Sequence, residues 1–249
     1  TDTNPISWIL DITQLQLENI AFGMVTSPQV SDLQVKVTSA LLKKGIVDLG
    51  KQSVEAESAI ISKADFSYLN DTTTISPPQP EITKADTVTT LPWTINVHFL
   101  QLQNSAGTYG LLHHIPQQGL DPNYIQVSGL NLSVGSFYNR GSEVKLKLLQ
   151  LSFIERSGLS VLRTQGDFRM NTNKISLTGF SLRTFLSQID ADIDLGGNII
   201  DQNPQSPVSV LLSARIAMQD IYSLYPDLQK EITLLPIEFL TANTRINGS

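Results

Sequence analysis

The sequence predicts an all-β, mostly antiparallel protein: an elongated, curved repeat sheet with a groove, and one or two short helices near the C-terminal part. The main observation is a duplicated segment, because residues 8–19 and 93–104 align without a gap, with Trp8 on Trp93. In each copy apolar residues alternate, skip one residue and alternate again. Side chains alternate between the faces of a strand, so the skip keeps one face apolar only if the strand bends or bulges there. Helical spacing of some apolar residues is an alternative, but β-branched content favours strands.

The first β-repeat unit is expected over residues 1–75. After the first strand, apolar residues alternate again from Val30 to Val37, beyond a turn at Ser27-Pro28. Residues 39–64 have apolar spacings that fit a helix, but each of Gly45 and Gly50 would cost about 1 kcal/mol relative to alanine in a helix. We therefore expect short strands that turn near these glycines. Further alternation then leads to a turn signal at Asn70-Asp71.

The remaining chain divides into a connector and two further units. Residues 76–92 are rich in Pro and Thr and read as an exposed connector. The second β-repeat unit is expected over 93–200, with a loop from Tyr109 to Pro116, a segment at 127–134 that matches 30–37, and then an antiparallel meander with turns near 156–158, Gly166 and 172–173. Residues 201–249 are expected to begin a third unit or to form a C-terminal cap, with a strand at 208–216 and a short helix at 220–224 ended by Pro226.

Composition excludes several classes of function. The net charge is −6 with scattered signs, which argues against nucleic acid as a partner because a basic face would be needed. There is no cysteine, hence no disulfide framework and no thiolate chemistry. No apolar run reaches the roughly 18 residues of a membrane-spanning helix, and no signal peptide is recognisable. Since the chain begins at Thr1, we expect it to be a piece of a longer or processed protein.

The duplicated strands supply the candidate site, an apolar groove that contacts lipid tails. Lipid tails need a continuous apolar strip, and each buried Å² of apolar surface is worth about 25 cal/mol. Two matching strands placed side by side would supply that strip, although the same residues could equally form an ordinary closed core. The candidate groove residues are Trp8, Leu10, Ile12, Leu15, Leu17, Trp93, Ile95, Val97, Leu100, Leu102, Leu130, Leu132 and Val134.

Metal and cofactor sites are not expected. Asp190, Asp192 and Asp194 have the spacing that begins a calcium loop, but Leu195 stands where the loop needs glycine. A strand with carboxylates on its wet face explains them better. Adjacent His113 and His114 would point in different directions, so they make a poor zinc pair.

Catalysis is not expected either, because the sequence contains no recognisable catalytic motif. Two alternatives stay open. One is a secreted or surface β-protein that binds carbohydrate or another protein, with Trp8 and Trp93 as stacking platforms. The other is a polysaccharide-cleaving β-solenoid with a carboxylate cleft, for which Asp190, Asp192 and Arg183 are the candidates.

Several stretches resemble the periplasmic β-repeat region of the translocation and assembly module protein TamB, in the AsmA-like family, as found in Bacteroidetes. The resemblance rests on Ile125 to Gly158, with its Val127-Ser-Gly-Leu-Asn-Leu132 and Leu151-Ser-Phe-Ile-Glu-Arg-Ser-Gly158 segments, on the two Trp strands, and on Ala214 to Pro226. These are patterns of apolar and polar residues, and the family has no catalytic signature.

The resemblance implies a periplasmic segment of a protein anchored to the inner membrane outside this chain. Such proteins form a taco-like trough of curved sheet, act in outer-membrane biogenesis, and are associated with phospholipid transport between membranes. The expected partners are therefore phospholipid or another acyl lipid and, by resemblance, an outer-membrane barrel of the BamA or TamA type. No cofactor is implied.

Overall fold

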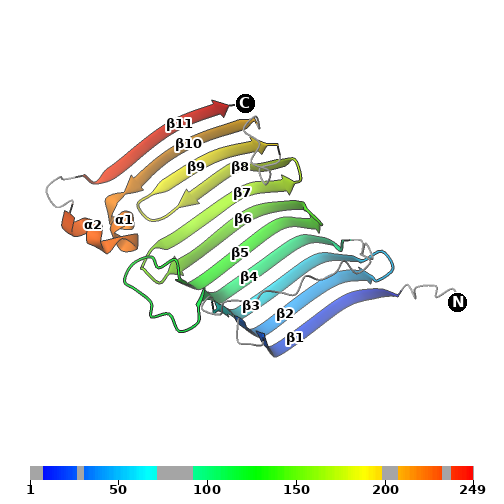
Figure 1. Ribbon diagram of the computed structural model, residues 1–249. Coiled ribbons are helices and arrows are strands. Elements are labelled where there is room, and N and C mark those ends of the chain that lie inside the picture. Colours follow the sequence, from blue (N-terminus) through cyan, green and yellow to red (C-terminus); the bar gives the residue numbers. More distant parts are fainter. Residues whose placement is uncertain (1–7, 27–30, 72–91, 198–206, 232–236, 249) are drawn as a thin grey trace, which may run out of the picture.

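A computed structural model describes residues 8–26, 31–71, 92–197, 207–231 and 237–248 (Figure 1). These residues form one open sheet of eleven strands, which follow one another in chain order. The all-β fold, mostly antiparallel and curved, is confirmed, as are two short helices near the C-terminal part. The elements are β1 (Ile9–Thr26), β2 (Ser31–Asp48), β3 (Ser53–Asn70), β4 (Thr94–Leu111), β5 (Tyr124–Arg140), β6 (Glu143–Glu155), β7 (Ser160–Asn171), β8 (Lys174–Arg183), β9 (Gln188–Gly196), β10 (Val208–Ala217), α1 (Met218–Leu224), α2 (Pro226–Glu231) and β11 (Phe239–Gly248).

The two copies of the repeated segment lie at the same level of the sheet. All neighbouring strands are antiparallel except β3 and β4, which are parallel, so β4 runs in the same direction as β1. Leu10 pairs with Val47, Val47 with Val54, and Val54 with Ile95. The duplication therefore builds matching crossings of one sheet. The expected units 1–75, 93–200 and 201–249 all contribute strands to that sheet, and most of the connector lies outside the described residues.

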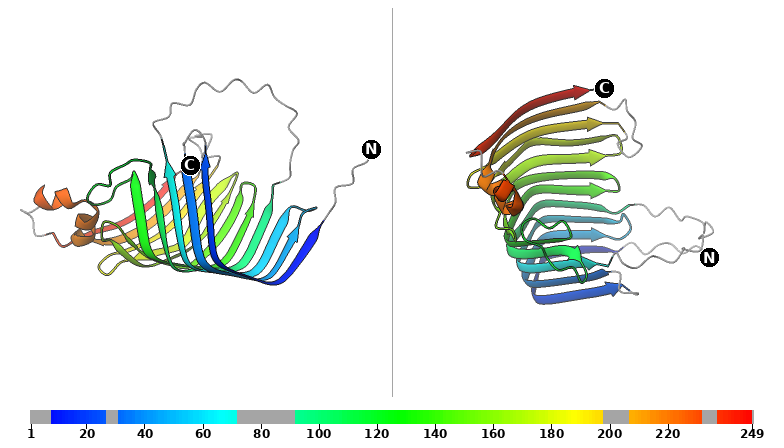
Figure 2. Two further views of the ribbon diagram at one scale, coloured as in Figure 1. Left: turned by 90° about the horizontal axis from the view of Figure 1, so that it is seen from below. Right: turned by 60° about the vertical axis from the view of Figure 1, so that its left-hand side comes forward.

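The long strands bend across their length, and the sheet is therefore a trough. Figure 2 shows that β1 to β5 curve upward at both ends and that the curvature lessens toward β11. Left-handed backbone marks one line of bends: φ is 52° at Asn19, 52° at Lys63 and 47° at Asn104, and the line continues at Gly129 with φ 58°. Lys44, with φ 48°, marks the other. Such angles are uncommon in residues other than glycine, and they mark the positions at which the strands bend.

Side chains satisfy the backbone groups that the bends release. At the line through Asn104, the Ala64 N–H donates to Ser105 Oγ at 3.0 Å and the Asn104 N–H donates to Asn131 Oδ1 at 3.0 Å. The Asn131 amide in turn donates to the Gly129 carbonyl at 2.9 Å. Buried peptide groups without partners are costly, so these short polar side chains allow a bend in the middle of a sheet.

Three details differ from the sequence-based expectation. Gly45 lies inside β2 rather than in a turn. Glycine fits this position because a Cβ there would come 2.9 Å from Leu42 Cδ2 at the bend. Gly166 is likewise inside β7, where a Cβ would lie 3.2 Å from Phe180 Cα of β8. Tyr109 belongs to β4, not to a loop.

The second sequence match is also displaced in space. Residues 30–37 align with 127–134 in sequence, yet Leu130 lies level with Val37 rather than with Leu33. Near the C-terminus, α1 begins at Met218, before the expected Asp220, and Pro226 begins α2. Proline is favourable at that position because the first helical residue needs no N–H. The expected turn at Ser27-Pro28 lies outside the described residues.

Candidate functional site: an apolar trough

A level of the sheet is a row of residues that pair across neighbouring strands. Two adjacent levels differ sharply in polarity, because neighbouring residues of each strand point to opposite faces. One level is apolar in every strand, and we call the face that carries it the trough face. Its members are Ile12, Gly45, Ala56, Val97, Phe137, Leu146, Phe168, Leu177, Ile193, Val210 and Ile246.

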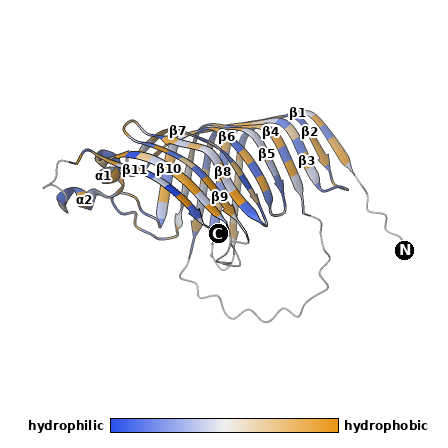
Figure 3. Ribbon diagram, turned by 90° about the horizontal axis from the view of Figure 1, so that it is seen from above, coloured by the Kyte–Doolittle hydropathy of each residue, from blue (hydrophilic) through white to orange (hydrophobic). Residues whose placement is uncertain are grey.

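The next level lies on the opposite face, which we call the outer face. It contains a single aliphatic residue among eleven positions. Its members are Asp11, Ile46, Glu55, Asn96, Tyr138, Lys145, Arg169, Ser176, Asp194, Ser209 and Asn247. Figure 3 shows the resulting alternation of hydrophobic and hydrophilic residues along the strands.

The trough face is the concave face. At the bends, two successive residues of β1 point outward, Thr13 with Gln14 and Glu18 with Asn19, which is what a strand that wraps around the trough face requires. The near-contact of a Cβ at residue 45 with Leu42 also shows that side chains on this face converge at a bend. Apolar side chains therefore predominate on the inside of the trough and polar side chains on the outside, where Leu41, Ile46 and Ile60 are exceptions.

No second layer covers the trough face in the described part of the chain. Each strand contacts its sheet neighbours, and the helices contact each other and β10. Near the floor the side chains still shield one another, so Val134 is 1 % exposed and Leu102 is 9 % exposed. In the edge strand β1 they are open to solvent: Leu15 is 40 % exposed and Phe22 is 54 % exposed. Contiguous accessible apolar surface is uncommon in monomeric soluble proteins, so this face is the candidate binding surface of the chain.

The expected groove residues come together on this face. Leu10, Ile12, Leu15 and Leu17 of β1 lie level with Ile95, Val97, Leu100 and Leu102 of β4, and β5 adds Leu130, Leu132 and Val134. Trp8 and Trp93 directly precede β1 and β4, at one rim of the trough. Leu49 directly follows β2, and its N–H donates to the Trp8 carbonyl at 2.9 Å.

The trough face extends well beyond the candidate set. Strands β2, β3 and β6 to β10 carry the same alternation, which the sequence shows but does not assign to a face. The additional trough-face residues in β2 and β3 include Val35, Val37, Leu42, Ala59, Ile61 and Phe66.

Aromatic residues stand at both rims. Opposite the Trp rim, the rings of Tyr68 and Tyr109 stack with centroids 5.9 Å apart, on the trough face. Tyr and Trp rings favour boundaries at which one end is apolar and the other is wet. Met24, Leu33 and Ile125, which flank the Tyr pair at this level, are aliphatic, unlike the Asn, Asp and Gln neighbours of a sugar-stacking ring.

The carboxylates of β9 lie on the outer face. Hydrogen bonds from Ser181 and Gln188 hold the pKa of Asp190 below its ordinary value, whereas a catalytic acid would need a raised pKa. Asp192 accepts the Gly179 N–H at 2.6 Å, and Asp194 pairs with Lys174 at 2.7 Å. Within the described ranges, no three His, Asp or Glu side chains are placed to hold a metal ion.

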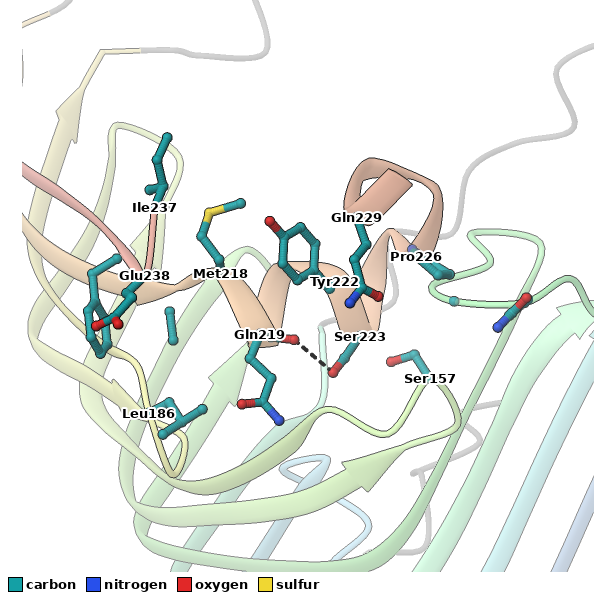
Figure 4. Close-up of a pocket in the computed structure, with 14 residues that line it drawn as sticks. Ser157, Leu186, Met218, Gln219, Tyr222, Ser223, Pro226, Gln229, Ile237 and Glu238 are labelled. Carbon is teal, nitrogen blue, oxygen red and sulfur yellow. Dashed lines mark hydrogen bonds between the residues drawn. The ribbon is translucent and has the colours of Figure 1, made fainter. Parts of the chain in front are cut away.

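A pocket of about 770 Å³, with a mixed polar and apolar lining, lies beside the helices (Figure 4). Met218, Tyr222 and Phe239 contribute apolar surface, and Gln219 and Glu238 contribute polar groups. The neighbouring loop at 112–123 packs on the helices, since the Leu120 N–H donates to the Leu224 carbonyl at 2.8 Å.

Asp121 organises that loop. Its Oδ2 accepts the Gln117 N–H at 2.8 Å and lies 2.7 Å from His114 Nε2, while Oδ1 accepts the Asn123 N–H at 3.0 Å. The Gln117 N–H and then the His114 ring lower the pKa of Asp121 below its ordinary value of 3.8. A carboxylate that is easier to ionise in the fold stabilises the fold above the unfolded pKa.

We expect Asp121→Asn to lower the melting temperature at neutral pH. Since the folded pKa of Asp121 is the lower one, its contribution is complete above about pH 3.8 and disappears as the pH falls below it. The difference in melting temperature between the wild type and Asp121→Asn should therefore shrink in acid, as followed by circular dichroism. Asp11→Asn, at an exposed position on the outer face of β1, is the control. A difference that is constant with pH would contradict this role.

No family model, curated protein or solved structure matches the chain. Among the described residues no helix is long and apolar enough to cross a membrane. The fold and its trough face define the class of protein by structure alone: an open, curved β-sheet with a mainly apolar inside and a mainly polar outside.

Proposed function

We propose that this chain is a non-enzymatic lipid-binding segment, in which the trough face holds the acyl tails of phospholipids during their transfer between membranes. The observation that carries the proposal is the apolar level that crosses all eleven strands without a polar side chain, on a concave face that no second layer covers in the described part of the chain. We further propose a periplasmic location, an anchor in the inner membrane outside this chain, a role in outer-membrane biogenesis, and a barrel partner of the BamA or TamA type, on the strength of the sequence resemblance to TamB.

The dimensions fit acyl chains that lie along the trough. Ten strand spacings of about 4.8 Å give a floor about 48 Å long. One leaflet of a bilayer core is about 15 Å thick, so two or three tails could lie end to end. Each fully buried CH₂ is worth about 0.8 kcal/mol, and an open trough that covers half of the tail gives about half of that value. An acyl tail would therefore be retained in the trough and could still move along its axis.

The polar outside supports the same proposal. Outer-face groups hydrogen-bond among themselves, as in the Ser62 hydroxyl and Gln103 at 3.1 Å and the Gln103 and Gln101 side chains at 2.9 Å. A polar outer face stays hydrated, whereas acyl tails favour the apolar trough face. A carbohydrate-binding surface is less well supported, because the exposed rings at the rims have aliphatic neighbours.

The test uses two adjacent isoleucines that point to opposite faces. Ile61 lies on the trough face, paired with Ala40 and Leu102, whereas Ile60 lies on the outer face, paired with Leu41 and Gln101. The chain is incubated with phosphatidylethanolamine and phosphatidylglycerol vesicles, re-isolated, and analysed by native mass spectrometry. We expect at least one bound phospholipid per chain, and several-fold less on Ile61→Glu than on Ile60→Glu.

Circular dichroism establishes that both variants are folded. Absence of bound lipid on the wild type, or an equal loss in the two variants, would contradict the proposal. Palmitate as a second probe separates tail binding from head-group binding, because a tail-binding trough retains palmitate as well.

A further inference from the structure

Glu155 is the one charged residue that strand pairing places on the trough face in the described strands. The level to which it belongs is otherwise apolar and consists of Phe22, Val35, Phe66, Gly107, Val127 and Glu155. Every other charged residue of these strands points to the outer face. A single carboxylate in an apolar level is costly and therefore calls for a physical reason.

The Glu155 carboxylate is buried and only half satisfied. The residue is 5 % exposed. Its Oε2 accepts the Ser157 N–H at 2.6 Å, whereas Oε1 has no hydrogen-bond partner. Within the described ranges no Lys, Arg or His side chain forms an ion pair with it. Because buried carboxylates normally have a cation or several donors, Glu155 leaves negative charge uncompensated at this point.

The pocket of about 770 Å³ lies directly beside Glu155. Ser157, whose N–H Glu155 accepts, is one of the lining residues of the pocket. The pocket follows the rim at which β6 to β11 end, opposite the Trp rim, since Leu186 comes from the turn between β8 and β9 and Phe239 begins β11. A lipid with its tails on the trough face can therefore place its head group in this pocket.

Two further carboxylates lie at the pocket. Glu238 lines it directly (Figure 4) and is exposed to solvent. Asp220 of α1 accepts the Thr184 hydroxyl at 2.6 Å and also accepts the Ser187 hydroxyl. These two donors are neutral, so they leave the charge of a carboxylate in place. Together with Glu155, these groups make the surroundings of the pocket acidic.

The arginines nearest to the pocket are held by other groups. Arg156 donates to the carbonyls of Gln117 and Gly119, the latter at 3.2 Å. The Arg215 guanidinium lies 4.0 Å from the centroid of the Phe239 ring. No Lys or Arg is among the described residues that line the pocket. A site of this kind attracts a cation and disfavours an anion.

The other lining groups are neutral and polar or apolar. Gln118, Gln219 and Gln229 contribute amide groups, whose carbonyl oxygens accept from an ammonium group and whose N–H groups donate to a phosphate. Met218 and Tyr222 contribute apolar surface. Pockets that bind small molecules typically measure about 300 to 1,000 Å³, so there is room for a lipid head group and its glycerol.

We propose that this pocket binds the ethanolamine head group of a phospholipid, with Glu238 in contact with the ammonium group and Glu155 attracting it from behind Ser157. This inference rests on the proposed function, because the tails of the same lipid would lie in the trough. A primary ammonium group offers three N–H donors to carboxylate and amide oxygens. Phosphatidylglycerol carries no cation, so its phosphate would meet the carboxylates uncompensated.

The first measurement compares the two head groups on the full chain. The chain is incubated with vesicles of equal parts phosphatidylethanolamine and phosphatidylglycerol, re-isolated, and analysed by native mass spectrometry. We expect about 10-fold more bound phosphatidylethanolamine, the value of one hydrogen bond to a charged group. Free phosphoethanolamine, added at the concentration of the lipid, should leave this ratio unchanged because the tails anchor the lipid. A ratio that disappears in its presence would indicate a site for a soluble amine and overturn the proposal.

The second measurement repeats the comparison on three variants. Glu238→Gln removes an exposed carboxylate and should lower the ratio by about 2- to 5-fold. Glu155→Gln keeps an acceptor for the Ser157 N–H and should lower the ratio by about 10-fold. Glu55→Gln removes an exposed carboxylate from the outer face of β3 and is the control for net charge. It should leave the ratio unchanged, and all three variants should bind as much total lipid as the wild type.

Circular dichroism establishes that the variants are folded, and Glu238→Gln decides the matter if Glu155→Gln is not. Bound lipid without a preference for phosphatidylethanolamine, or a preference that Glu238→Gln and Glu55→Gln lower equally, overturns the head-group site and leaves tail binding intact. A wild-type chain that binds neither lipid overturns the proposed function itself.

Discussion

Val134→Asp is expected to remove most of the stability of the sheet. Val134 is 1 % exposed and lies on the trough face of β5 between Leu100 and Leu148. A carboxylate there would be buried without a partner, which costs several kcal/mol, on the order of the whole stability of a domain. Urea unfolding followed by circular dichroism would show the transition at a much lower urea concentration, or no folded baseline.

Ser133→Asp is the matched control for this substitution. Ser133 precedes Val134 in β5 but lies on the outer face, paired with the polar residues Gln101 and Gln150. A carboxylate there stays hydrated, so we expect a change within about 1 kcal/mol. Equal destabilisation by the two substitutions would contradict the assignment of the faces, because only the trough face excludes water near the floor.

Gly119→Ala is expected to release the loop at 112–123 from the helices. Gly119 has φ +80°, and a Cβ there would collide with the Leu224 carbonyl and lie 2.7 Å from Pro226 Cδ. Positive φ costs an L-residue about 1–2 kcal/mol, and the collision with backbone atoms adds to it, for a total of roughly 3 kcal/mol or more. Hydrogen exchange should show faster exchange of the Leu120 amide, which donates to Leu224.

Gly129→Ala separates the two costs. Gly129 also has positive φ, +58°, but no heavy atom lies within 4 Å of a Cβ built there. We expect only the backbone cost, about 1–2 kcal/mol, with the loop still docked. If Gly119→Ala destabilises the protein no more than Gly129→Ala does, then the contact of the loop with α1 and α2 does not require glycine at 119.

Local pattern was sufficient to predict much of the fold. Alternation identifies a strand because side-chain direction has a period of two, and the skip after Ile12 and Val97 implies a bend because an extra residue otherwise reverses the face. The duplication of Trp8 to Asn19 at Trp93 to Asn104 predicts two equivalent crossings of a sheet. The same alternation predicted which side chains of β1, β4 and β5 share a face.

Glycine positions were harder to interpret. A glycine in an apolar strand signals either a turn or a close approach of neighbouring atoms, and these are indistinguishable within one strand. At Gly45 and Gly166 the reason is a neighbour that is close in space: the Leu42 side chain across a bend, and the Phe180 backbone in the next strand. The turn predicted at each of these glycines was therefore wrong.

The sequence by itself determined most of the strands, the faces shared by β1, β4 and β5, and the existence of bends, because each depends on residues within a few positions of one another. Only the tertiary structure decided that β3 and β4 pair in parallel, that the bends line up as Asn19, Lys63 and Asn104, and that no described segment covers the trough face. These depend on register between strands up to 85 residues apart, and on whether another layer packs on the sheet. The duplicated strands fit a closed core equally well; it is the uncovered, concave arrangement that makes them the wall of a trough.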